Sequence, residues 1–258
     1  MDGTNLTHIT PNSAGDRTAR LSLARLRQPW NAAELLSGTE QYIAALPDAE
    51  RRASQDMMWS SICSEHDARH FYRQLLTAGP TLPWKMQDFL ATWLADEVNH
   101  ARGFKILYRA LYDRSFEEIE QALQARAIDF SHMEELFDDL LSICLLFAYD
   151  ELVTTRVYQA NIPFYARFGS SALDEWIRRL VYDESQHYKA GMSIIVEYCR
   201  EELPHSERIL KKVIDIDLGQ TDYRGTFVLD HVCPEFPFER AQLESLARRG
   251  ILYRLRGR

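Results

Sequence analysis

Two stretches of the sequence carry apolar residues at alternating steps of four and three, the spacing of a helix that packs along other helices. In each stretch a glutamate and a histidine interrupt the apolar series: Glu97 and His100 in the first, Glu184 and His187 in the second. The three-residue step puts each pair on one face of its helix. An ionised glutamate on a buried helix face is very unfavourable unless another group compensates its charge. The chain therefore needs a compensating group at both places, and a bound metal ion would supply it.

Two further helical stretches each place one glutamate in a similar apolar frame. Glu65 lies in the first of them, whose frame is expected to continue to Leu76, and Glu151 lies in the second. The distance along the chain from Glu65 to Glu97 nearly equals the distance from Glu151 to Glu184. The chain is therefore predicted to contain two similar helical hairpins, each of which supplies one glutamate and one E-x-x-H motif.

The duplication makes the E-x-x-H motif a more specific signal for a metal site than a single copy would be. A single E-x-x-H is expected by chance in a chain of this size, because the motif is short. Two copies in matching frames, each preceded by an in-frame glutamate at matched spacing, predict a site for two metal ions. The alternative is two buried Glu–His pairs that Arg69 and other polar residues balance, but this alternative gives no reason for the equal spacings.

Glycine and proline residues divide the chain into helical segments. Thr81 and Ser171 are the expected N-caps of the two helices with E-x-x-H motifs, and Pro163 is expected to end the helix of Glu151. Four expected helices longer than 25 residues predict an all-α fold, a four-helix bundle with additional helices. The expected helices cover about residues 31–46, 51–77, 81–112, 131–162 and 171–202, with a short amphipathic segment at 115–127.

The patterns along the chain predict three regions. Residues 1–28 are expected to form a flexible N-terminal tail, and residues 29–220 the helical bundle that carries the metal site. Residues 221–258 are expected to form a C-terminal extension packed on the bundle. This extension is rich in turn-forming residues and partly strand-like at first, and helical and basic towards its end.

The overall charge and the cysteines limit the possible classes of function. The formal net charge of −8 at pH 7 argues against a nucleic-acid partner, because phosphate binding requires a basic surface. No apolar run is long enough to span a membrane, and the N-terminal residues lack the apolar segment of a secretory signal. The four cysteines are far apart in the sequence, which fits a reducing compartment and excludes a four-cysteine metal centre. A cytoplasmic protein is expected.

The order Glu, E-x-x-H, Glu, E-x-x-H on four helices resembles the ferritin-like di-iron carboxylate proteins. The resemblance covers residues 51–202 and rests on six ligand positions rather than on an extended sequence match. It implies two half-sites, with one glutamate of each E-x-x-H motif bridging the two metal ions. The half-sites would be Glu65, Glu97 and His100 on one side, and Glu151, Glu184 and His187 on the other.

The resemblance also implies roles for residues next to the ligands. Asp183 would hold the far side of His100, and Asp96 the far side of His187, which fixes the tautomer of each ring. Thr155 lies four residues after the third-helix glutamate, where bacterial multicomponent monooxygenases have a threonine, and Thr154 is beside it. The Thr155 hydroxyl would relay a proton to bound oxygen. The alternative is that this hydroxyl bonds a carbonyl of its own helix.

Carboxylate and imidazole ligands suit iron or manganese, so two Fe ions are expected, with Mn or a mixed Mn/Fe pair as the alternative. The resemblance implies an O2-dependent oxygenase or oxidase that hydroxylates, N-oxygenates or desaturates an organic substrate, either small or carrier-tethered. Such an enzyme needs two electrons per turnover, which implies a ferredoxin or flavin reductase partner, and a homodimer is expected. Two alternatives stay open: a di-manganese catalase and a non-catalytic ferritin-like iron-binding protein.

Overall fold

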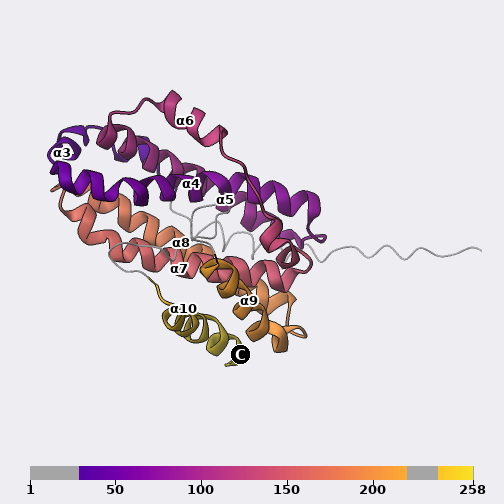
Figure 1. Cartoon of the computed structure of the whole chain (residues 1–258). Coiled ribbons are helices and arrows are strands. Elements are labelled where there is room, and N and C mark those ends of the chain that lie inside the picture. The colour runs from indigo at the N-terminus through magenta and orange to yellow at the C-terminus, as the bar shows by residue number, and fades with distance from the viewer. Residues whose placement is uncertain (1–28, 220–237, 258) are drawn as a thin grey trace, which may run out of the picture. The chain divides into compact units, whose positions relative to one another are not determined.

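The computed structural model describes residues 29–219 and 238–257, and every structural statement below concerns these residues. All regular elements within these two ranges are helical, so the predicted all-α class is confirmed for them (Figure 1). The expected N-terminal tail at residues 1–28 and the strand-like start of the C-terminal extension lie outside the described residues. In the described ranges, each helix is too short or too polar to cross the hydrocarbon core of a bilayer.

Four long helices dominate the fold (Figure 1). Helix α4 packs along α5 and helix α7 packs along α8, while α5 also contacts α8. Only a few residues connect the helices within each pair, so each pair is an antiparallel hairpin, as the sequence predicts. The two are named the α4–α5 hairpin and the α7–α8 hairpin below. Their helices are α4 (Asp48–Ala78), α5 (Trp84–Tyr112), α7 (Leu140–Ala166) and α8 (Ser171–Tyr198).

Helix α7 is buried around most of its circumference, because protein surrounds it on several sides. It contacts α8 and four shorter elements: the 3-10 helix η1 (Ser131–Phe137), α9 (Ser206–Leu218), α10 (Arg240–Ala247) and the π-helix η3 (Arg248–Leu252). Apolar residues on all faces of α7 fit this position. The consequence for the site is that Glu151, in the middle of α7, is only 3% exposed.

A glycine on α5 allows a close approach between α5 and α8. A Cβ atom added to Gly103 would lie 2.5 Å from Nε1 of Trp176, whose indole packs on the α5 backbone at this point. Phe104 contacts the same indole edge-on, with a distance of 4.8 Å between ring centroids. The contact lies one turn beyond His100, between the two helices that carry the E-x-x-H motifs.

Several predicted helix ends are wrong by a few residues. Helix α7 begins at Leu140, because residues 131–137 form the 3-10 helix η1 and the Asp139 side chain caps α7 by accepting a bond from the Ser142 backbone. It continues through Pro163 to Ala166, since a proline in the last turn removes only one hydrogen bond at the end of the helix.

The predicted N-caps and the lead-in helix also need correction. The N-cap of α5 is Pro83 instead of Thr81, and that of α8 is Ser170 instead of Ser171. The lead-in helix is divided into α2 (Ala32–Leu35) and α3 (Glu40–Ala44), because Gly38 between them has a φ of +76°, which interrupts a helix. The expected amphipathic segment forms α6 (Phe116–Gln124). The chain ends in the π-helix η3 (Arg248–Leu252) and α11 (Tyr253–Arg256).

Candidate metal centre

All six residues that the sequence suggests as metal ligands come together between the two hairpins. Their ligand atoms form two groups, and within each group the atoms all lie within 4.8 Å of one another. The groups share two glutamates, one from each E-x-x-H motif. One group is Glu65, Glu97, His100 and Glu184, and the other is Glu97, Glu151, Glu184 and His187. Each of the six side chains belongs to a residue that is at most 6% exposed.

The two histidines present the same ring nitrogen to the cluster. The Nδ1 atom of His100 lies 3.1 Å from Oε1 of Glu184 and 3.4 Å from Oε2 of Glu65. The Nδ1 atom of His187 lies 2.9 Å from Oε2 of Glu184 and 3.3 Å from Oε2 of Glu151. A metal ion between a histidine and these carboxylates would therefore bind Nδ1.

The opposite ring nitrogens each contact an aspartate. Nε2 of His100 is 3.2 Å from Oδ2 of Asp183, and Nε2 of His187 is 3.3 Å from Oδ2 of Asp96. These contacts join the same histidines and aspartates that the resemblance pairs. An aspartate that accepts a hydrogen bond from Nε2–H leaves Nδ1 unprotonated in a neutral ring, which is the tautomer that a metal at Nδ1 requires.

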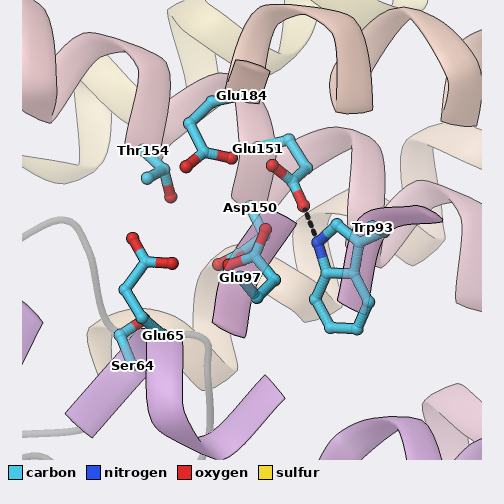
Figure 2. Close-up of a pocket in the computed structure, with 8 residues that line it drawn as sticks. All are labelled: Ser64, Glu65, Trp93, Glu97, Asp150, Glu151, Thr154 and Glu184. Carbon is cyan, nitrogen blue, oxygen red and sulfur yellow. Dashed lines mark hydrogen bonds between the residues drawn. The ribbon is translucent and has the colours of Figure 1, made fainter. Parts of the chain in front are cut away.

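Two aromatic side chains hold the glutamates that belong to only one group. The indole nitrogen Nε1 of Trp93 donates a hydrogen bond to Oε1 of Glu151 at 2.8 Å, as Figure 2 shows. The hydroxyl of Tyr158 donates to Oε1 of Glu65. The sequence gives no signal for either contact, because Trp93 and Tyr158 occupy apolar-frame positions where an aromatic residue is ordinary core.

All four of these supporting contacts cross from one hairpin to the other. Asp96 and Trp93 of the α4–α5 hairpin reach ligands of the α7–α8 hairpin, and Asp183 and Tyr158 reach ligands in the opposite direction. The arrangement of the cluster therefore depends on how the two hairpins dock.

The residues fit a pair of divalent cations. Four buried carboxylates carry four negative charges when ionised, and no ion pair in the described part of the chain joins them to a lysine or arginine. Buried oxygens of Glu65, Glu97 and Glu184 also accept no hydrogen bond from the described residues. Isolated buried charges of this kind are very costly, and two divalent ions would balance them.

The pKa values of the cluster show how it accommodates its charge without metal. Burial, reinforced by the negative charges of Glu65 and Glu184, raises the pKa of Glu97 well above its ordinary value. Burial likewise raises the pKa of Glu151. Burial alone would lower the pKa values of both histidines, but the facing carboxylates outweigh it and raise them. Protons thus take the place that cations would otherwise fill.

A small cavity borders the carboxylates on the side shown in Figure 2. It has room for about one water-sized molecule. Thr154 lines it, whereas Thr155 does not: the Thr155 hydroxyl donates to the backbone carbonyl of Glu151 at 2.6 Å. The structure therefore brings the neighbouring threonine, rather than the predicted one, to the cavity. The lining residues are Ser64, Glu65, Trp93, Glu97, Asp150, Glu151, Thr154 and Glu184.

The chain was compared with known proteins at the level of family models and of single sequences. No family model and no curated protein matches it. What is established is an all-helical structure, over the described residues, with buried groups of glutamate and histidine that could hold metal ions. The choice of metal and the reaction are inferred from the chemistry of these groups.

A third group of possible ligands lies beside the cluster, but its members already contact arginine and lysine side chains. His66, Asp67 and His70 place ligand atoms within 4.8 Å of one another. Asp67 forms an ion pair with Arg126, and Nζ of Lys105 lies 3.3 Å from Nδ1 of His66. Burial and the nearby positive charges lower the pKa of His66 to about 3, so this ring is neutral and accepts from Lys105. Lys105 also pairs with Glu120 of α6, so the group fastens α6 to α4 and α5.

The Asp67–Arg126 pair leads to a prediction about stability. Asp67→Ala should lower the free energy of unfolding by about 3 kcal/mol, because Asp67 is fully buried and its loss leaves a mostly buried guanidinium without this partner. Asp174→Ala is the control, since it breaks an exposed pair with Arg178 and should cost less than about 1 kcal/mol. Urea unfolding of both variants measures the difference, and equal losses would contradict the structural role of Asp67.

Proposed function

We propose that the protein is an O2-dependent, non-haem di-iron oxygenase or oxidase built on a ferritin-like four-helix bundle. The observation that supports this most directly is the sharing of Glu97 and Glu184 between two groups of buried ligands. Two shared carboxylates between two sets of terminal ligands are what a pair of bridged metal ions requires. Oxygen and imidazole ligands without a cysteine favour iron or manganese.

Each side chain then has a definite task. Glu97 and Glu184 would be shared by two metal ions, His100 and Glu65 would complete the ligands of one ion, and His187 and Glu151 would complete those of the other. Iron at these positions would activate dioxygen for hydroxylation, N-oxygenation or desaturation of an organic substrate. The protein holds the ligands rigidly, because every terminal ligand is fixed by a partner from the opposite hairpin.

Thr154 is the residue best placed to move a proton in this function. Its side chain lines the cavity together with Glu65 and Glu184, as Figure 2 shows. A hydroxyl can accept one proton while it donates another, so Oγ1 of Thr154 can pass a proton to a molecule in the cavity. Asp150, one turn earlier on α7, lines the same cavity and adds a further carboxylate to it.

The proposed reaction needs two electrons per turnover from outside the protein. We therefore propose a ferredoxin or flavin reductase as a partner. We also propose a homodimer as the working unit and a cytoplasmic location. The organic substrate, small or carrier-tethered, would reach the cluster from the cavity side, because both histidines are buried and Phe89 packs against His187.

One observation favours a second candidate, a di-manganese catalase. The cavity accepts a molecule of the size of water or hydrogen peroxide, whereas an organic substrate requires lining side chains to move. A catalase also needs no reductase. A ferritin-like iron-binding protein without turnover would use the same ligands and is separated from both enzymes by the assay below.

The test is to load the protein with Fe(II) without oxygen, count the metal ions per chain, and then admit oxygen. We expect two iron ions per chain, and oxygen consumption that continues beyond the first turnover only when a reductase and an oxidisable substrate are present. A parallel sample loaded with Mn(II) is tested for release of oxygen from hydrogen peroxide. Rapid peroxide breakdown by the manganese form alone would replace the oxygenase by the catalase. One metal ion or none per chain would overturn both.

A further inference from the structure

The two terminal glutamates bind their surroundings in the same way. In each, Oε1 accepts a hydrogen bond from an aromatic side chain of the other hairpin, Tyr158 for Glu65 and Trp93 for Glu151. In each, Oε2 faces Nδ1 of a histidine, at 3.4 Å for Glu65 and 3.3 Å for Glu151. One oxygen is therefore occupied by the aromatic donor, and the other points to the place where the histidine would bind a metal ion.

The aromatic donors interrupt the duplication of the chain. Trp93 lies four residues before Glu97, and the corresponding residue before Glu184 is Leu180, which is fully buried and has no side-chain donor. Glu151 is thus held by an indole N–H from α5, while Glu65 is held by a phenol O–H from α7. The two halves share their ligands but differ in the donors that hold the terminal carboxylates.

We propose that Tyr158 and Trp93 are positioning residues that hold Glu65 and Glu151 as single-oxygen metal ligands, and that the two metal positions are therefore unequal. This inference rests on the metal site proposed above. Orienting a buried carboxylate in advance removes part of the entropy that metal binding would otherwise cost. A phenol is more acidic than an indole and forms the shorter, stronger bond to a carboxylate, so it withdraws more charge from Glu65 than Trp93 withdraws from Glu151.

Calorimetric titration with Mn(II), which is stable in air, tests the inference on the metal-free protein. The wild-type chain should bind two Mn(II) ions in two steps of different affinity. Tyr158→Phe should weaken one step by about 10- to 100-fold and Trp93→Phe the other by a similar factor, since loss of such supporting contacts usually has this effect. Both variants should still bind two ions at high Mn(II) concentration, because all six ligands remain.

Two matched controls separate positioning from general damage to the core. Tyr149→Phe removes a buried hydroxyl on the same helix that donates to Asp217 at 2.6 Å, a carboxylate outside the cluster. Trp176→Phe removes a buried indole whose N–H has no hydrogen-bond partner among the described residues. Neither change should alter the two affinities by more than about twofold. A control variant that weakens Mn(II) binding as much as a test variant does would overturn the inference.

A double-variant cycle identifies the carboxylate through which Tyr158 acts. In a Glu65→Ala background, Tyr158→Phe should have no further effect on Mn(II) affinity, because the group that it positions is gone. An undiminished effect in that background would show that Tyr158 acts elsewhere. If the wild-type chain binds no Mn(II) or Fe(II), the proposed metal site itself fails. If it binds two ions and both variants bind like wild type, only the positioning roles fail.

Discussion

Glu97→Ala or Glu184→Ala is expected to abolish binding of both metal ions, whereas Glu65→Ala or Glu151→Ala should remove only one. The reason is that Glu97 and Glu184 belong to both groups of ligands, while each terminal glutamate belongs to one. Loss of a shared carboxylate takes one negative charge and one ligand from both positions together. The number of Mn(II) or Fe(II) ions per chain after gel filtration, measured by elemental analysis, checks this.

The same four variants contain their own control. All replace a buried glutamate by alanine, so they make cavities of similar size in the same region. A difference between the shared and the terminal pair therefore reports ligand sharing rather than packing. Circular dichroism should confirm that helix content is unchanged. Two ions retained by Glu97→Ala or Glu184→Ala would refute the bridged arrangement, and so would equal loss in all four variants.

The second large effect is on stability. Each Mn(II) ion at a free concentration of 100 times its dissociation constant should add about 2.7 kcal/mol to the free energy of unfolding, so two independent sites add about 5 kcal/mol. The metal-free protein is expected to have a correspondingly lower free energy of unfolding, because it keeps four carboxylates and two imidazoles buried in one cluster. Urea unfolding with and without Mn(II) measures the difference.

A rise in pH should lower the stability of the metal-free protein but increase the stabilisation that Mn(II) gives. In the metal-free protein, the raised pKa values of Glu97, Glu151 and both histidines contribute stability that is present below their ordinary values and is lost as pH rises through the folded values. Glu184 has the reverse sign: burial opposes its ionisation, but the charged histidines lower its pKa, so its contribution is lost only in acid.

Glu184 is ionised in both the folded and the unfolded state between pH 6 and 8, so the four groups with raised pKa values decide the trend, and the metal-free protein should become less stable as pH rises over this range. Metal binding displaces the protons, so the stabilisation by Mn(II) should instead increase over the same range. Unfolding curves at both pH values, with and without Mn(II), check both trends. A metal-free protein that is more stable at pH 8 than at pH 6 would contradict the inference that protons balance the charge of the cluster in the absence of metal.

The six candidate ligands could be picked out from the sequence because each breaks a strong physical expectation. A glutamate or histidine in an apolar frame has no ordinary reason to be there, and Glu97 and Glu184 repeat the same exception. The supporting tryptophan and tyrosine break no expectation, since Trp93 and Tyr158 suit a helix core whether or not their polar atoms have partners. Only the docked hairpins show which oxygen each donor meets.

Local patterns also do not show which positions of a helix frame find packing partners in the folded chain. The frame of Glu65 was expected to continue to Leu76, but Leu76 is 55% exposed, while Phe71 and Leu75 are buried. Met58 and Leu76 are eighteen residues, or five full turns of an α-helix, apart, so rotation of the helix does not account for the exposure of Leu76. Leu76 lies in the last turn of α4, and the packing partners rather than the frame decide whether such a residue is buried. Likewise, Thr154 and Thr155 point in directions about 100° apart around α7, and only the packed structure shows that Thr154 lines the cavity while Thr155 bonds its own helix.

The two aspartate–histidine contacts relate the hairpins as an isologous interface relates the subunits of a two-fold dimer, because equivalent residues of α5 and α8 exchange them. Each hairpin offers its partner one aspartate for a histidine and one aromatic donor for a terminal glutamate, and receives the same in return. Each also carries its own terminal glutamate, shared glutamate and histidine. The chain thus has the organisation of a fused dimer: either hairpin, paired with a second copy of itself, contains every group needed for a symmetrical two-metal site.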